Sequence, residues 1–276
     1  MLHEWFTTTT PRLDTQCSSI FWKWTAKNMK ILELLFPQNV KCLFCGKEDG
    51  GFGICDECVK SLPYIEGKTC IKCGAPINSG NVCYECKNSN HHFERVFSIF
   101  NYDGEIKQSI IKFKQAGSKY VGRPLATLVA DYFDKLEIPF DTIIPMPIHP
   151  NRLESRGFNQ SELLLEVVKS RYGRVYNNVL ARVKDTPHQT GLGKANRQKN
   201  LDKAFKVIEK SKVKNKVVLV FDDIYTTGST IDEVAKTLYK AGAVKVYGLC
   251  LAHAMFKNDK VVESNPSALD LKDIYI

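Results

Sequence analysis

The chain has 276 residues, of which 43% are hydrophobic and 25% charged, and it carries a formal net charge of +9. This length allows one or two domains, and the apolar share excludes a wholly disordered chain. No stretch approaches the ~18 consecutive apolar residues of a membrane span, and polar residues interrupt the region where a Sec-type signal peptide would have its apolar core. We therefore predict no membrane span and a cytoplasmic location.

The N-terminal residues 1–28 contain a threonine run and three tryptophans without a helical or strand period. We predict that they form an extension, which is either disordered or derived from a start upstream of a true start at Met29. After Met29, apolar residues recur at helical spacing until Pro37, which predicts a short helix.

Eight cysteines in the next segment form an internal repeat, in which four cysteines in two CxxC pairs recur 28 residues later. The two sets are Cys42, Cys45, Cys55 and Cys58, then Cys70, Cys73, Cys83 and Cys86. A CxxC turn presents two thiolates to one ion, and two turns complete a Zn²⁺ tetrahedron that leaves no open position for water. We therefore predict two structural zinc sites, with residues 29–95 forming a short helix plus a double zinc ribbon.

Other interpretations of the cysteines are weaker. Disulfides are disfavoured because no export signal is predicted, and a redox role is disfavoured because four CxxC copies exceed what thiol exchange needs. Consecutive CxxC turns are the favoured pairing at each ion, although an interleaved pairing remains open. Each Zn²⁺ with four thiolates has a local charge of −2, so two sites lower the formal charge from +9 to about +5.

From residue 96 the pattern becomes α/β. Strand-like runs alternate with apolar stripes at helical spacing. The strands are expected near 96–102, 141–146, 217–221 and 244–252, and the helices near 106–113, 125–132, 163–168 and 231–238. Apolar strands that alternate with helices indicate a parallel sheet. We predict an α/β domain over 96–256, followed by a tail over 257–276.

The clearest binding motif follows the apolar run 217–221. Two carboxylates, Asp222 and Asp223, precede a hydroxyl-rich turn that opens a helix and contains Thr226, Thr227, Gly228, Ser229 and Thr230. Backbone N–H groups at a helix start suit a phosphate monoester, and the carboxylates can accept hydrogen bonds from sugar hydroxyls. The motif therefore favours a sugar 5-phosphate site over a simple helix cap at Ser229, since a cap needs no adjacent carboxylates.

This motif resembles the phosphoribosyl-diphosphate (PRPP) binding motif of type I phosphoribosyltransferases, and residues 29–255 as a whole resemble the ComF family. The family resemblance rests on the upstream double CxxC unit and on four further segments, which are Tyr102 with 107–114, 145–152, the RGFNQ run at 156–160, and 182–205. It implies a type I phosphoribosyltransferase-like parallel sheet with helices, preceded by a small double zinc-ribbon domain.

The resemblance also implies residue roles. Asp222 and Asp223 would contact the ribose, residues 226–230 the 5-phosphate, and the turn after Pro145 the diphosphate, under a mobile loop over 186–200. Diphosphate needs cations and arrives with Mg²⁺. The diphosphate and lid candidates are Pro145, Met146, Arg152, Arg156, Lys194, Arg197 and Lys199.

The function implied by the resemblance is PRPP binding in single-stranded DNA handling during natural transformation, with a ComFA-like helicase and a DprA-like protein as partners. The alternative is an active type I phosphoribosyltransferase that acts on a nucleobase or amine. No residue stands out as general base, so catalytic residues stay unassigned. Residues 96–200 hold 16 Lys and Arg against 10 Asp and Glu, but the phosphate site needs part of this surplus.

Overall fold

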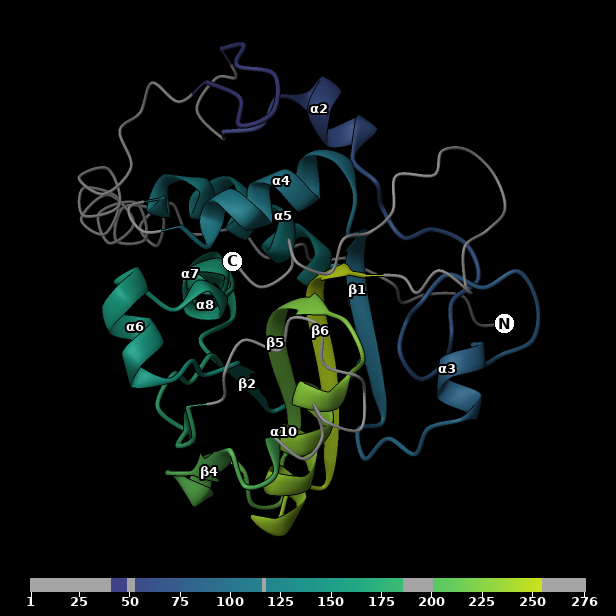
Figure 1. Ribbon diagram of the computed structural model, residues 1–276, viewed down its shortest axis with the longest axis vertical. Coiled ribbons are helices and arrows are strands. Elements are labelled where there is room, and N and C mark those ends of the chain that lie inside the picture. The colour runs from purple at the N-terminus through teal and green to yellow at the C-terminus, as the bar shows by residue number, and fades with distance from the viewer. Residues whose placement is uncertain (1–40, 49–52, 116–117, 186–200, 255–276) are drawn as a thin grey trace, which may run out of the picture. The chain divides into compact units, whose positions relative to one another are not determined.

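The computed structural model describes residues 41–48, 53–115, 118–185 and 201–254, and Figure 1 shows how their elements are arranged. The expected extension over 1–28, the helix after Met29, the loop over 186–200 and the tail over 257–276 lie outside these ranges. None of the helices within the described ranges has both the length and the apolar character needed to cross a bilayer.

The centre of the fold is a four-stranded sheet in the order β1-β6-β5-β2. All three neighbouring pairs are parallel, which confirms the predicted parallel sheet. The strands are β1 (Arg95–Asn101), β2 (Thr142–Pro145), β5 (Val217–Tyr225) and β6 (Lys245–His253).

Strand β5 is longer than the apolar run 217–221 predicts. It continues to Tyr225, because β6 pairs with it as far as the Tyr225–His253 partners. Asp222 and Asp223 therefore lie within the strand, where Asp222 is paired with Cys250, instead of following it in a loop. Cys250 is fully buried, as expected of a core residue.

Helices cover both faces of this sheet. The described helices after β1 are α4 (Gly104–Phe113), α5 (Gly122–Phe133), α6 (Pro150–Arg156), α7 (Gln160–Leu164), α8 (Glu166–Tyr172) and α10 (Ser229–Lys240), with 3-10 turns at Lys119–Val121 and Lys210–Lys212. The helix expected near 163–168 is in fact two short helices, α7 and α8. An unpredicted two-stranded antiparallel sheet pairs β3 (Leu180–Arg182) with β4 (Phe205–Val207).

The alternation of β5 side chains separates two buried clusters. Val218 and Val220 belong to one cluster with Val234 of α10, whereas Leu219 and Phe221 belong to the other, which also includes residues of α4 and α5. Successive side chains of a strand point to opposite faces, so α10 covers one face of the sheet while α4 and α5 cover the other. In Figure 1, α10 accordingly lies in front of β5 and β6.

The cysteine repeat is also a repeat in backbone structure. The N–H of Cys42 donates to the Lys47 carbonyl at 2.7 Å, and 28 residues later the N–H of Cys70 donates to the Ala75 carbonyl at 2.8 Å. Each repeat ends in a short helix, α2 (Asp56–Ser61) or α3 (Tyr84–Lys87). Cys42 packs in the cluster with α4 and α5, whereas all four cysteines of the second repeat pack in the cluster with α10.

Candidate functional site

The eight cysteines form two groups whose geometry fits zinc. The sulfur atoms of Cys42, Cys45, Cys55 and Cys58 lie within 4.8 Å of one another, and so do those of Cys70, Cys73, Cys83 and Cys86. Zn–S bonds of about 2.3 Å in a tetrahedron place sulfurs about 3.8 Å apart, whereas a disulfide needs about 2.05 Å. The Cys45–Cys55 and Cys73–Cys83 sulfur distances are both 3.6 Å, and all eight thiols are free. The predicted zinc ribbons and their consecutive pairing are confirmed.

The two zinc sites differ in solvent access. Cys45 of the first site is exposed, and Cys55 and Cys58 are partly buried. All four cysteines of the second site are buried. The second site is therefore part of the protein core, whereas only Cys42 of the first site is buried.

A cavity opens at the carboxyl end of the parallel strands, where ligands of open α/β sheets bind. Its walls come from β5 and the turn that leads into α10, from the turn after β2 and from α6, from the C-terminal end of α4, and from α7 and β3. The lining residues are Lys114, Met146, Pro147, Ile148, Arg152, Arg156, Gln160, Ser161, Arg182, Asp222, Asp223, Ile224, Thr226 and Thr230.

Two carboxylates form the floor of this cavity. The N–H of Asp223 donates to Asp222 Oδ1 at 2.9 Å, and Lys114 Nζ lies 3.3 Å from Asp223 Oδ2. Burial and the neighbouring charge of Asp223 raise the pKa of Asp222 to about 8, against the opposing charges of Lys114 and Arg182. Because like charges this close disfavour each other, the pair is suited to a cation or to hydroxyl donors from a ligand.

Partly buried cations and a buried amide line the cavity with the carboxylates. Burial lowers the pKa of Arg182 to about 10 and also lowers the pKa of Arg156. Arg156 Nη1 donates to Gln160 Oε1 at 3.3 Å, while Gln160 Nε2 has no partner among the described residues although its side chain is 3% exposed. A buried donor without a partner is costly, so an acceptor from a ligand would stabilise it.

The turn 226–230 closes one side of the cavity. Gly228 has φ of +75°, and a Cβ there would collide with the Tyr225 hydroxyl, so the turn requires glycine. Thr227 Oγ1 lies 2.8 Å from Ser229 Oγ, so these two hydroxyls form a hydrogen bond with each other. Opposite, the N–H of Met146 donates to the Phe221 carbonyl at 2.7 Å, which holds the turn after β2 against β5.

The sequence-predicted site residues are thus largely brought together. Asp222, Asp223, Thr226, Thr230, Met146, Arg152 and Arg156 line the cavity. Thr227, Gly228 and Ser229 complete its turn without lining it, and Pro145 ends β2 one residue before the lining begins. Lys194, Arg197 and Lys199 lie outside the described residues. The ligand contacts of all these residues remain predictions.

Seven lining residues were absent from the predicted site, and three of them bear charged or amide side chains. These three, Lys114, Gln160 and Arg182, come from the residue that caps the C-terminus of α4, from α7 and from β3, which lie far apart in sequence. All three lie in segments that carry the ComF resemblance, which was the one signal that could have selected them. Without the fold, nothing distinguishes them from neighbouring lysines, amides and arginines.

Comparison with known proteins supports the same organisation. Residues 31–87 match a family model described as a double zinc ribbon domain. Two solved structures are similar over about half of the chain. They are an allosteric regulatory enzyme of purine biosynthesis (16% identity, TM-score 0.32, covering 47% of this chain and 26% of that one) and the glutamine PRPP amidotransferase from B. subtilis (18% identity, TM-score 0.30, covering 51% and 26%).

Relatives by sequence cover more of the chain. The DNA utilization protein YhgH of Salmonella typhimurium is 29% identical over 170 residues, which cover 59% of this chain and 74% of that protein. Competence protein ComFC of Streptococcus pneumoniae is 32% identical over 156 residues, covering 55% and 66%. Competence protein F of Haemophilus influenzae is 31% identical over 232 residues, covering 79% of this chain and 93% of that protein. With a double zinc ribbon, a parallel α/β sheet and this identity along nearly a whole competence protein, the chain belongs to the ComF family.

Proposed function

We propose that this chain binds PRPP with Mg²⁺ in the cavity at the end of β5 and acts in single-stranded DNA handling during natural transformation, in the cytoplasm. One observation carries the PRPP proposal. The Asp222–Asp223 pair and the turn at Gly228 adjoin a cavity that also contains Lys114, Arg152, Arg156 and Arg182. A sugar with phosphate groups at two ends needs this combination of acceptors and cations.

The three parts of PRPP have matching protein groups. The N–H groups and hydroxyls of the turn 226–230 suit the 5-phosphate, because the N-terminus of α10 favours negative charge there. Asp222 and Asp223 would accept hydrogen bonds from the ribose hydroxyls. Arg152 and Arg156, beside the turn that follows β2, would neutralise the diphosphate.

The donor set also fits Mg²⁺, which prefers carboxylate, phosphate and water oxygens. Asp222 and Asp223 offer carboxylate oxygens next to the proposed ribose and diphosphate positions. When bound, the ion supplies positive charge to the diphosphate. The side chains would hold the ribose and exclude water from it.

The role in DNA handling is supported by the names of the relatives, which are competence and DNA utilization proteins. Tyr84 of the second ribbon is 62% exposed, so its ring is available for stacking on a base. A ComFA-like helicase and a DprA-like protein are the partners that the family membership suggests.

One observation favours the alternative, an active type I phosphoribosyltransferase. Asp222, with its pKa raised to about 8, holds or accepts a proton near neutral pH inside the cavity. In such a reaction the acceptor nitrogen would replace the diphosphate oxygen on C1 of the ribose. Diphosphate release from PRPP over a panel of nucleobases and amines separates the two functions, since release supports transfer and its absence, with binding retained, supports a PRPP-responsive protein.

The proposal is tested by calorimetric titration of the protein with PRPP and Mg²⁺. We expect saturable binding at one site per chain, reduced beyond detection in an Asp222→Asn/Asp223→Asn variant. The matched control is Asp131→Asn/Asp134→Asn, which alters two exposed carboxylates that pair with Arg171. Unchanged binding in the cavity variant, or no binding by the wild type, would contradict the proposal.

A further inference from the structure

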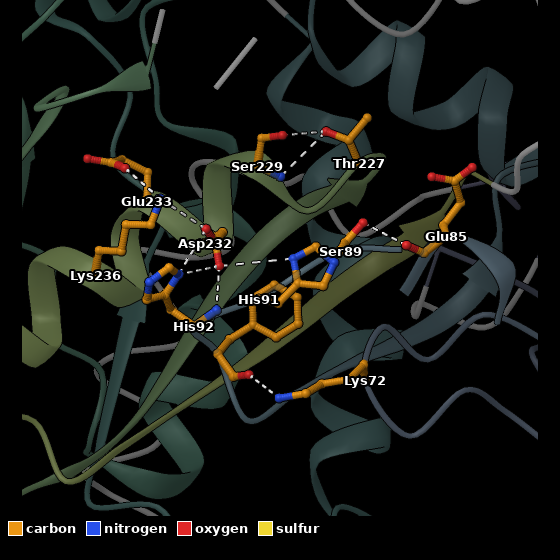
Figure 2. A network of polar contacts seen from close by, with 11 residues as sticks. Lys72, Glu85, Ser89, His91, His92, Thr227, Ser229, Asp232, Glu233 and Lys236 are labelled. Carbon is orange, nitrogen blue, oxygen red and sulfur yellow. Dashed lines mark hydrogen bonds and ion pairs between the residues drawn. The ribbon is translucent and has the colours of Figure 1, made fainter. Parts of the chain in front are cut away.

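The second zinc ribbon contacts the helix that opens the proposed phosphate site. The segment between its last ligand, Cys86, and strand β1 reaches the first turn of α10, where the side chain of Asp232 is only 5% exposed. Figure 2 shows His91, His92 and Lys236 gathered around this carboxylate. A buried carboxylate is stable only when such partners surround it, so Asp232 fixes the segment to the helix.

The contacts to Asp232 are close and come from two elements. The backbone N–H of His92 donates to Asp232 Oδ1 at 2.5 Å, and His92 Nδ1 lies 3.1 Å from the same oxygen. The His91 ring is 4.0 Å away, and Lys236 Nζ of α10 is 3.2 Å from Oδ2. The backbone N–H of Asp232 also donates to the Gly228 carbonyl, so the residue that holds the His91–His92 segment is bonded directly to the turn 226–230, the proposed phosphate turn.

A second set of contacts reaches the other end of the turn. Lys72, inside the CxxC turn of Cys70 and Cys73, donates from Nζ to the Phe93 carbonyl at 2.9 Å. The Phe93 ring stacks on His91 and meets Tyr225 edge to face, with centroids 4.7 and 6.5 Å away. Tyr225 is the residue directly before the phosphate turn and packs in the same buried cluster as the four cysteines.

The first zinc ribbon is different. Its buried ligand Cys42 packs in the cluster with α4 and α5, on the opposite face of the sheet from α10. Among the described residues, no hydrogen bond or ion pair joins it to residues 225–240. The two repeats have the same sequence spacing but different neighbours, which makes each a control for the other.

We propose that the second zinc ribbon is a positioning element for the phosphate turn. It fixes both ends of the turn, through Phe93 on Tyr225 and through His91 and His92 on Asp232. PRPP affinity therefore depends on zinc in the second site and not on zinc in the first. This inference rests on the proposed function for its ligand, but the physical coupling also exists without PRPP.

The test compares Cys86→Ser with Cys58→Ser, which remove the fourth ligand of each repeat. Each variant should bind one zinc ion per chain. We expect Cys86→Ser to weaken PRPP binding about tenfold, in the range of typical couplings between sites, and Cys58→Ser to change it less than about twofold. Hydrogen exchange of residues 226–240, measured without PRPP, should accelerate in Cys86→Ser alone.

A second variant, Asp232→Asn, keeps all eight cysteines and decides the matter if Cys86→Ser does not fold. It should retain two zinc ions, weaken PRPP binding several-fold, and cause little further loss when combined with Cys86→Ser. Equal effects of the two cysteine variants, or unchanged affinity and exchange in Asp232→Asn, would overturn the coupling. A wild type that does not bind PRPP would contradict the proposed function instead, and hydrogen exchange would then judge the coupling by itself.

Discussion

Two neighbouring carboxylates, Asp222 and Asp223, lie in the central strand of the sheet at its carboxyl end. Lys114 pairs with Asp223 and the charge of Arg182 acts on Asp222, but burial still raises the pKa of Asp222 to about 8. This arrangement is unfavourable for the empty protein. It is typical of a site whose polar groups are selected for a ligand, at a cost in stability.

Replacement of Asp222 should therefore stabilise the protein at alkaline pH. The folded protein holds the Asp222 proton up to about pH 8, whereas the unfolded chain loses it near the ordinary value of 3.8, so this group lowers stability as pH rises between these values. We expect Asp222→Asn to raise the free energy of unfolding by about 2 kcal/mol more at pH 8 than at pH 6. Urea denaturation at both pH values measures this, with the exposed Glu137→Gln as control. Equal effects at both pH values would contradict the assigned pKa.

Arg182 should contribute directly to ligand affinity. Its guanidinium lines the cavity and is largely desolvated, so a charge-assisted bond to an anionic ligand is strong there. We expect Arg182→Gln to weaken PRPP binding by about tenfold or more. Arg174→Gln is the matched control, because Arg174 is exposed and donates only to the Phe140 carbonyl among the contacts described. Calorimetry that finds equal affinities for both variants would remove Arg182 from the site.

Part of the candidate site could be predicted from the sequence alone. Asp222, Asp223 and the turn after them are contiguous, so their chemistry is readable as one motif. Lys114, Gln160 and Arg182 reach the cavity from three separate segments. Their convergence depends on how the helices and the small β3–β4 sheet pack. Local patterns contain no information about such packing. That part of the site became visible only with the fold.

Among the elements, long apolar periods were predictable and short ones were not. The four strands of the sheet and helices α4, α5 and α10 lie close to their expected positions, because each buries a full strand or a full helical stripe. The small sheet of β3 and β4 has three residues per strand, too few for a visible alternation of apolar and polar residues. The extension of β5 to Tyr225 was missed because pairing with β6 overrides the polar character of Asp222 and Asp223.

The turn 226–230, the proposed phosphate turn, depends on glycine at position 228. An alanine there would take a left-handed conformation and collide with the Tyr225 hydroxyl. We expect Gly228→Ala to lower the free energy of unfolding by about 1–3 kcal/mol and to abolish PRPP binding. Thermal unfolding and titration measure both effects. Because the hydroxyl is the nearest obstacle, adding Tyr225→Phe should restore part of the stability, and no restoration would show that the hydroxyl itself is not the cause.

The two zinc ribbons should release their ions at different rates. The first site has an exposed ligand in Cys45, whereas the second is buried in the core. We expect a colorimetric chelator to remove zinc in two phases of one ion each, with the second phase accompanied by loss of tertiary structure. Cys58→Ser should eliminate the fast phase, and Cys86→Ser the slow one. A single phase that releases both ions together would contradict this order.

The net charge of the whole protein depends on whether zinc is bound. With zinc bound, the formal charge is near +5 instead of +9, and four of the remaining cations line a single cavity. Part of the basic surplus therefore lies at the proposed PRPP site, and less of it is available for a DNA backbone. Stacking on exposed aromatic side chains gains importance accordingly.

Single-stranded DNA binding should therefore be modest and only partly electrostatic. We expect a labelled single-stranded oligonucleotide to bind at low salt with a logarithmic salt slope of about −2 to −3, corresponding to roughly three to four phosphate contacts. Tyr84→Ala should weaken binding by about tenfold without changing that slope, because stacking releases no counterions. Fluorescence anisotropy measures both. Preference for duplex DNA, or no binding at low salt, would contradict the DNA-handling role.

The central claim is that one cavity holds both ends of PRPP, and a crystal structure of the protein grown with PRPP and Mg²⁺ tests it most directly. Difference density should place the 5-phosphate on the turn 226–230, the ribose against Asp222 and Asp223, and the diphosphate beside Arg152 and Arg156. Density elsewhere on the protein, or an empty cavity at saturating PRPP, would contradict the account.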